Sequence, residues 1–285
     1  MSKKLDNIPY CDPVTGTCTP DTPAADSGKL QDIPYCDPVT GSCTPGAGPE
    51  SAQQPAATDE EDGEADDAEA SSQEVIYIGD PMCSWCWGME PGLRTLHKAA
   101  AEAGLPYTIL VGGLRPGGGE AWDDAMRQFL RHHWEEVWTR TGQPFSYELL
   151  DDKERSFDYD TEPPCRAVVI AREMLLERED EESALHDFFA GIQYHFYADN
   201  ADPGQVDFYR EICAQTGLDF AVFSERFASE EARQATYAEF NMVREWGVSG
   251  FPTVVLRKGR ELHLITSGYA TGKALVHAMK DLMAA

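Results

Sequence analysis

Two cysteines spaced two residues apart, Cys83 and Cys86, carry the clearest chemistry in this sequence. They follow an apolar run at residues 75–78, and the stretch 89–103 after them reads as a helix. A strand, a tight turn with a Cys-x-x-Cys motif and a helix form the layout of a thiol–disulfide redox site. At a helix N-terminus, unpaired N–H groups and the positive end of the dipole stabilise a thiolate, the species that attacks a disulfide. We therefore predict that Cys83 attacks the substrate and that Cys86 resolves the mixed disulfide.

Two other roles for this pair are half of a zinc site and burial as structural cysteines. Zinc would need two more ligands at suitable spacing, and the rest of the domain offers no second Cys-x-x-Cys. Burial is disfavoured because Trp85 and Trp87 bracket Cys86 in a turn after a strand, where residues tend to be presented at the surface. Motif and context therefore favour redox chemistry, and no metal site is expected.

Composition divides the chain of 285 residues into a tail and one folded domain. Residues 1–74 contain almost no long apolar run and are rich in Pro, Gly, Ala, Ser, Thr and acidic residues, so we expect them to be largely disordered. Residues 75–285 hold nearly all the Trp, Phe, Leu and Val, which is enough for a core. We predict a tail over 1–49, an acidic disordered linker over 50–73 and an α/β domain over 74–285.

The charge of the chain limits the classes of partner that it is expected to bind. The formal net charge is −27, and residues 50–74 hold ten acidic residues and no basic one, as in a solvated, self-repelling linker. Binding to nucleic-acid phosphates is therefore not expected. The N-terminus lacks the apolar segment of a signal peptide, and no apolar run reaches the roughly 18 residues of a membrane span. We expect a cytoplasmic protein without membrane contact, where cysteine pairs are more often catalytic, redox-sensing or metal-binding than structural.

A repeat in the tail supplies four further cysteines. Residues 5–20 recur at 30–45 with three substitutions, and each copy contains a Cys-x6-Cys pair around Asp-Pro-Val-Thr-Gly. That sequence favours a turn, because proline fixes φ and glycine tolerates positive φ. Each copy can therefore bring its two thiols together. The pairs are Cys11 with Cys18 and Cys36 with Cys43.

Three roles compete for these tail pairs: redox exchange with the Cys-x-x-Cys dithiol, a four-thiolate zinc site, or a recognition motif whose cysteines are incidental. The spacing is wider than that of common zinc knuckles. About 31 residues separate Cys43 from the domain, and a flexible linker of that length spans roughly 30 Å on average. We rank redox exchange first, because two thiols per copy suit exchange and an address tag does not need both.

Within the domain the predicted order is β-α-β, a helical insertion over about 120–246, then β-β-α. Residues 107–111 read as a strand parallel to the first, and 248–256 and 261–265 as an antiparallel hairpin followed by a helix over 271–283. The insertion is expected to hold helices near 121–139, 163–178, 183–197, 203–216, 219–227 and 230–246. Trp134 and Trp138 on the first of these could line a groove facing the dithiol, although amphipathic packing is the favoured role.

This order, with Cys83-Ser84-Trp85-Cys86 after the first strand and Gly250-Phe251-Pro252-Thr253 before the third, resembles the thioredoxin fold with a DsbA-type helical insertion. It is most similar to the cytoplasmic FrnE-like branch of predicted disulfide isomerases, over residues 74–285. The resemblance implies a cis peptide before Pro252, which would be the residue that orients the substrate, and it repeats the roles of nucleophile and resolving thiol for the two cysteines. Substrate contacts are expected at Trp85, Gly250 and Phe251, where Phe251 backbone groups could pair with a substrate strand.

The sequence departs from that family at two points. The residues between the cysteines include no histidine, so strong oxidising power is not implied. In related proteins a buried acid six residues before the first cysteine assists proton transfer, and here that position is Tyr77. Asp80 is the nearest acid, but it could simply cap the turn or the helix. The proton acceptor for Cys86 is therefore unassigned.

The leading functional prediction is a dithiol–disulfide oxidoreductase or isomerase acting on protein or small-molecule disulfides, with a thiol as electron donor. It needs no cofactor beyond its redox-active disulfide, and glutathione or another low-molecular-weight thiol could take part. A glutathione-dependent isomerase or transferase of the kappa type is a second prediction, weakened because those enzymes generally have a lone serine where this chain has Cys83. A third is a non-catalytic adaptor with a zinc- or partner-binding tail.

Overall fold

The computed structural model describes residues 10–11, 18–19, 73–177 and 182–285. The predictions for the second tail repeat and the acidic linker lie outside these residues. Within the first repeat, strands β1 (Tyr10–Cys11) and β2 (Cys18–Thr19) pair antiparallel, with Cys11 opposite Cys18 in the backbone register.

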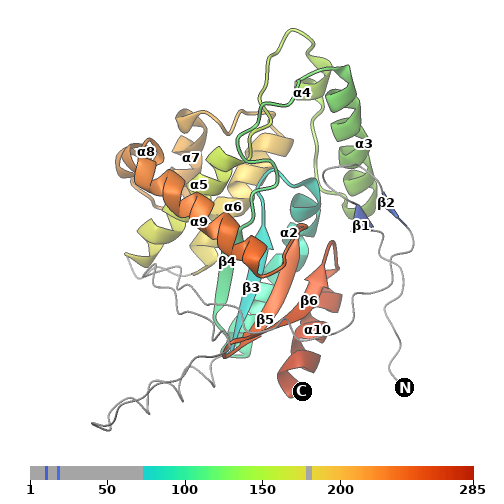
Figure 1. Ribbon diagram of the computed structural model, residues 1–285, viewed down its shortest axis with the longest axis vertical. Coiled ribbons are helices and arrows are strands. Elements are labelled where there is room, and N and C mark those ends of the chain that lie inside the picture. Colours follow the sequence, from blue (N-terminus) through green and yellow to red (C-terminus); the bar gives the residue numbers. More distant parts are fainter. Residues whose placement is uncertain (1–9, 12–17, 20–72, 178–181) are drawn as a thin grey trace, which may run out of the picture.

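The sheet of the folded domain has four strands in the order β4-β3-β5-β6 (Figure 1). Strand β3 (Gln73–Gly79) runs parallel to β4 (Tyr107–Val111) and antiparallel to β5 (Thr253–Lys258), which forms a hairpin with β6 (Glu261–Ser267). The parallel pairing of β3 with β4 and the antiparallel hairpin of β5 with β6 are as predicted. The four-stranded sheet of parallel and antiparallel pairs, together with the helical insertion, forms the α/β DsbA-like thioredoxin fold.

Helices cover both faces of the sheet. Successive residues of the central strand point to opposite faces, so each face has apolar side chains for a helix to bury. Tyr77 and its neighbours at alternate positions join a core with helix α2 (Ser84–Glu102), while helix α10 (Gly272–Ala284) packs beside α2 and β6. Ile76 and Ile78 face the other way and pack against helix α9 (Glu230–Glu245). The central strand is therefore buried from Val75 onward, and the Cys-x-x-Cys turn follows its C-terminal end.

The insertion between β4 and β5 is helical, as predicted, and lies toward one end of the sheet (Figure 1). Before α9 its elements are α3 (Asp124–Thr141), α4 (Glu148–Asp151), α5 (Glu162–Leu176), α6 (Glu182–Tyr197), the 3₁₀ helix η1 (Val206–Tyr209), α7 (Arg210–Gln215) and α8 (Phe220–Phe227).

Two details of the insertion differ from the prediction. The expected helix over 203–216 begins later and starts as a 3₁₀ turn. The Asp202 carboxylate accepts the N–H of Gly204, and the Asp202 backbone carbonyl accepts the N–H of Gln205, so these residues form a tight turn instead. The four-residue helix α4 was not predicted, since one turn is too short to show helical periodicity.

The tryptophans of α3 divide between core and surface. Trp134 is fully buried among aromatic side chains that include Trp87 and Tyr197, so packing explains it. Trp138 is 56% exposed. The predicted groove lining therefore does not apply to Trp134.

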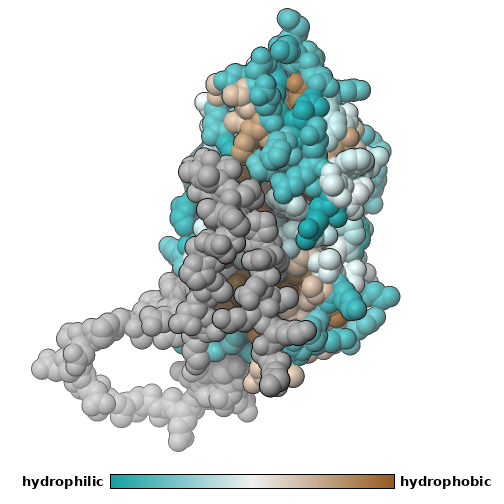
Figure 2. All heavy atoms as spheres, turned by 90° about the vertical axis from the view of Figure 1, so that its right-hand side faces the viewer, coloured by the Kyte–Doolittle hydropathy of each residue, from teal (hydrophilic) through white to brown (hydrophobic). Residues whose placement is uncertain are grey.

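Hydrophilic residues predominate on the face of the molecule in Figure 2. That surface agrees with a sequence in which charged residues make up 26% of the total and acidic residues outnumber basic ones. None of the described helices is both long and apolar enough to cross a membrane.

Candidate active site

Cys83 is the N-cap residue of α2. Its backbone N–H donates to the carbonyl of Asp80 at 3.0 Å, which closes the turn, and its carbonyl accepts the N–H of Trp87 at 3.1 Å, which starts the helix. Side chains cap α3, α8, α9 and α10 at their N-termini, whereas no side chain caps α2. The first-turn N–H groups and the positive end of the helix dipole therefore remain available to a thiolate at Cys83.

The loop before β5 meets this cysteine. The Cys83 thiol donates to the backbone carbonyl of Phe251 at 3.5 Å, although the two residues are 168 positions apart. The Phe251–Pro252 peptide bond is cis, as the resemblance implied. Pro252 is buried, and its carbonyl accepts the N–H of Gly268 at 2.7 Å, so the loop is tied to the end of β6. The structure thus brings together the two motifs on which the sequence prediction depended.

A glycine makes room for this loop. A side chain at Gly112, the residue after β4, would place its Cβ 1.9 Å from the ring of Phe251. The N–H of Gly112 also donates to the carbonyl of Gly79, which extends the β3–β4 ladder by one bond. Gly112 therefore positions Phe251 by allowing its ring close to the end of the sheet.

The two thiols lie in different surroundings. Cys83 is 6% exposed, whereas Cys86, one turn into α2 on the side facing the sheet, is fully buried. Burial, followed by the neighbouring Cys83, raises the pKa of the Cys86 thiol well above its usual range, so it is protonated at neutral pH. The expectation that the turn presents Cys86 at the surface is wrong, because the helix begins directly after Cys83 and turns Cys86 into the core.

Partly exposed residues lie near the dithiol. Trp85, Gly250 and Phe251, the predicted substrate contacts, are all half-buried. The ring of Trp85 lies 5.7 Å from that of Tyr269, and the guanidinium of Arg140 lies 5.9 Å from the Tyr269 centroid. Aromatic surface thus lies at Trp85, two residues after Cys83, and a cation lies over Tyr269 beyond it.

Asp80 caps the turn and not the helix. One of its carboxylate oxygens accepts the N–H of Met82 at 2.8 Å, and the other accepts the N–H of Leu114 at 2.6 Å. The thiol of Cys165 donates to the second oxygen at 3.4 Å. Burial raises the pKa of Asp80 although these donors oppose it. Asp80 therefore links the active-site turn to the segment after β4.

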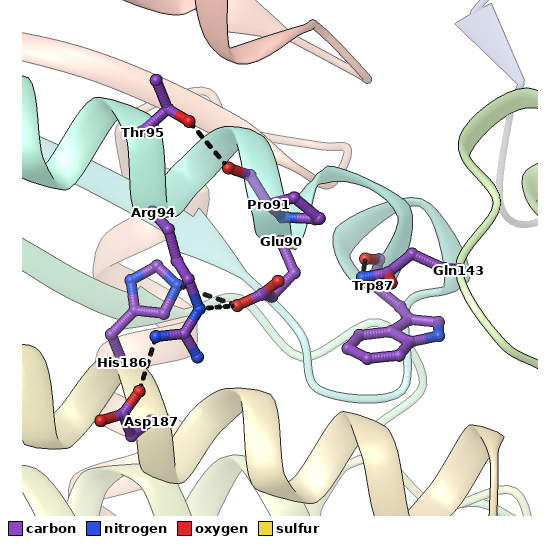
Figure 3. A network of polar contacts seen from close by, with 8 residues as sticks. All are labelled: Trp87, Glu90, Pro91, Arg94, Thr95, Gln143, His186 and Asp187. Carbon is purple, nitrogen blue, oxygen red and sulfur yellow. Dashed lines mark hydrogen bonds and ion pairs between the residues drawn. The ribbon is translucent and has the colours of Figure 1, made fainter.

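The insertion repairs a gap in the active-site helix. Pro91 lies inside α2 and has no N–H to donate to the carbonyl of Trp87, four residues earlier. The side-chain amide of Gln143 donates to that carbonyl at 2.9 Å (Figure 3). The indole N–H of Trp87 donates to the carbonyl of Pro144 at 3.0 Å. The segment after α3 thus holds the helix turn that contains Cys86.

A second link joins α2 to α6 further along the helix. Arg94 pairs with Glu90 on its own helix and donates to Asp187 of α6 at 2.6 Å (Figure 3). His186 Nε2 lies 3.7 Å from the same Glu90 carboxylate. The helix that carries the dithiol is therefore fixed to the insertion at two places.

Gln143→Ala should lower the free energy of unfolding by about 1 kcal/mol, because it leaves the Trp87 carbonyl without a donor in a partly buried place. Chemical denaturation monitored by circular dichroism measures the loss. Gln215→Ala is the matched control, since Gln215 donates only to the exposed Glu211 side chain and its replacement should change stability little. Equal stability of both variants would show that the Trp87 carbonyl does not depend on Gln143.

Comparison with solved structures identifies the family of this chain. No protein-family model matches the sequence. A solved structure from Nitrosomonas europaea, a candidate protein disulfide isomerase, is 36% identical to this chain, with a TM-score of 0.65 over 75% of this chain and 98% of that one. The chain belongs to the DsbA-like thioredoxin-fold family.

Two further matches are less similar to this chain. The cytosolic disulfide reductase DsbM from Pseudomonas aeruginosa, solved with GSH, is 24% identical, with a TM-score of 0.58 over 74% of this chain and all of that one. The ClpXP adapter protein SpxH of Halalkalibacterium halodurans is 22% identical over 205 residues, which is 68% of this chain. The chain spans 62% of the length of that curated relative.

Three positions in this DsbA-like site were not predicted from the sequence. They are Gly112 beneath Phe251, Gln143 at the Trp87 carbonyl and Cys165 at the Asp80 carboxylate. Pro91 could have indicated a role for a residue such as Gln143, because a proline inside a helix leaves the carbonyl four residues earlier, here that of Trp87, without its usual donor. No local signal marks Gly112 or Cys165, since each acts on a residue far away in the chain.

Proposed function

We propose that this chain is a thiol–disulfide oxidoreductase or isomerase that works through a mixed disulfide at Cys83. One observation carries the proposal: the Cys83 thiol lies at an uncapped helix N-terminus and faces the Phe251 carbonyl of the cis-proline loop. The proposed substrates are protein or small-molecule disulfides, and the proposed electron donor is glutathione or a similar thiol.

The reaction follows from the different surroundings of the two thiols. The Cys83 thiolate attacks one sulfur of the substrate disulfide R–S–S–R′, forms the bond Cys83–S–S–R and releases R′–S⁻. Cys86, held one helical turn away, then attacks the Cys83 sulfur and releases R–S⁻. The dithiol loses two electrons and the substrate gains them. A thiol donor returns the enzyme to its reduced form.

Substrate binding is proposed at the backbone of the cis-proline loop and the aromatic surface beside it. The Phe251 carbonyl can accept a hydrogen bond from an extended substrate segment as a strand edge does. Trp85 and Tyr269 offer apolar contact, and Arg140 can attract a carboxylate of the substrate. Such a site suits peptide disulfides of varied sequence, because the backbone contact does not depend on side chains.

Insulin reduction tests the proposal. With dithiothreitol as donor, the protein should accelerate precipitation of the insulin B chain well above the rate with dithiothreitol alone. A rate equal to that background would overturn the proposal.

An adaptor role is the second candidate, and the similarity to the ClpXP adapter SpxH favours it. An adaptor would keep the fold without needing turnover, and its tail would bind zinc or a partner. Stoichiometric zinc that disappears on deletion of residues 1–49, together with no insulin reduction, would support this candidate over the enzyme.

We also propose that the tail pairs exchange electrons with Cys83. The backbone register that sets Cys11 opposite Cys18 supports it, since opposed antiparallel residues have Cα atoms about 4.5–5.5 Å apart, within the range of a disulfide. In a Cys86→Ala chain, peptide mapping should find disulfides between Cys83 and tail cysteines. Their absence under mildly oxidising conditions would contradict the exchange.

A further inference from the structure

Tyr77 lies beneath the dithiol, in the middle of the central strand. Across the sheet it pairs with Ile109 of β4 and Val254 of β5, and its side chain joins the core that contains both active-site cysteines. The ring is 1% exposed and meets Phe189 edge to face, with centroids 5.7 Å apart. Its position is therefore fixed on all sides by packing.

The hydroxyl of Tyr77 extends along the strand toward the Cys-x-x-Cys turn. Gly79 lies two residues further on, on the same face of β3. A Cβ at Gly79 would lie 2.2 Å from Tyr77 Oη, so the missing side chain is the space that the hydroxyl occupies. Tyr77 and Gly79 together thus place a phenol at the end of the strand, where α2 begins.

Among the described residues, no group forms a hydrogen bond of ordinary geometry with this buried hydroxyl. The polar group that acts on it most strongly is the Cys86 thiol, which lies in the same buried core. Burial, and then Cys86, raises the pKa of Tyr77 well above its usual range, so the phenol stays neutral and keeps its proton. A neutral phenol can donate to a thiolate but cannot act as a base.

Two groups at the end of β3 act on the pKa of the Cys86 thiol against the effect of burial. Burial and Cys83 raise the pKa of the Cys86 thiol, whereas the Tyr77 hydroxyl and the backbone N–H of Asp80 lower it. The other titratable groups that face Cys86 are Cys83 at the start of α2 and Tyr197 from α6. The Asp80 carboxylate is engaged by Met82 and Leu114, so it is not aimed at this sulfur.

We infer that the buried Tyr77 hydroxyl is the donor that holds the Cys86 thiolate while it resolves the mixed disulfide. This inference rests on the proposed oxidoreductase function and names how its second step is assisted. Hydrogen bonds to a charged group are stronger than neutral ones, and a buried thiolate without donors is costly. The tyrosine thus occupies the position six residues before Cys83 as a donor and not as a proton acceptor.

The resolving step moves one proton and exchanges one disulfide bond for another. The Cys86 thiol gives its proton to the first leaving thiolate, R′–S⁻, which departs as R′–SH, or to water when R′–S⁻ is a weakly basic aromatic thiolate. The Cys86 thiolate, with its charge held by the Tyr77 hydroxyl, attacks the Cys83 sulfur. The Cys83–S–S–R bond breaks, R–S⁻ leaves with the electron pair, and the Cys83–Cys86 disulfide forms.

Tyr77→Phe removes the hydroxyl and keeps the ring. The test uses the full chain with the four tail cysteines replaced by serine, and the aromatic disulfide dithionitrobenzoate as substrate. Release of the first nitrothiolate reports attack by Cys83, and release of the second reports attack by Cys86. The variant should keep the first rate, and the pH midpoint of the second should rise by about one unit, a tenfold change in thiolate fraction.

At pH 7 the second rate should fall only about threefold, because a more basic thiolate is also a better nucleophile. Tyr209→Phe is the control: it removes a buried hydroxyl that donates to Pro203 and should leave both phases unchanged. An unaltered pH midpoint in Tyr77→Phe would overturn this inference alone. Absence of both phases in the unmutated site would instead overturn the proposed function.

Discussion

Replacing Cys83 by alanine should reduce insulin reduction to the rate of dithiothreitol alone, a loss on the order of a hundredfold or more. The nucleophile is then gone, and Cys86 cannot replace it because Cys86 is fully buried and protonated at neutral pH. The rate of turbidity growth at constant protein concentration measures the effect.

Cys213→Ala is the matched control for that loss. Cys213 is also a buried cysteine, but it lies on α7, and burial raises the pKa of its thiol to about 12. Its replacement should leave insulin reduction intact. Undiminished activity of the Cys83→Ala protein would remove Cys83 from the reaction and with it the proposed mechanism.

Replacing Cys86 by alanine should stop turnover and trap the substrate on Cys83. The first attack needs only the thiolate at the start of α2, whereas release of the second product needs the thiol one turn later. With the tail cysteines replaced by serine, incubation with a cysteine-containing peptide disulfide should add close to one peptide mass per chain, as read by intact mass spectrometry.

The doubly substituted chain, Cys83→Ala with Cys86→Ala, controls for reaction at Cys165 and Cys213 and should gain no peptide. A peptide that maps to Cys165 or Cys213 in the Cys86→Ala protein would contradict the assignment of Cys83. Rapid turnover by the Cys86→Ala protein would show that an external thiol, and not Cys86, resolves the mixed disulfide.

The fold and the position of the dithiol could be predicted because both depend on patterns of apolar residues within short segments of the sequence. The apolar run before the turn, the helix after it and the strand at 107–111 have strong periodicity, and their directions follow from short connections. The link between Cys83 and Phe251 could be predicted only through the resemblance to a known family. Nothing near either residue indicates that they meet.

The chemistry of the second thiol could not be predicted, because it depends on contacts between distant residues. The spacing of the cysteines does not reveal that α2 turns Cys86 into the core. The resemblance implies that Tyr77 stands where related proteins have an acid, but the position of its hydroxyl depends on the room that Gly79 leaves. The role of Gln143 depends likewise on Pro91, more than fifty residues earlier.

An equilibrium redox titration tests the central claim most directly. The protein is equilibrated in glutathione buffers of graded potential, quenched with acid and labelled with a thiol reagent, and the labelled peptides are identified by mass spectrometry. We expect Cys83 and Cys86 to lose their free thiols together in one two-electron transition, while Cys165 and Cys213 stay reduced. Two cysteines that remain thiols throughout, or that oxidise independently of each other, would contradict a redox function for this site.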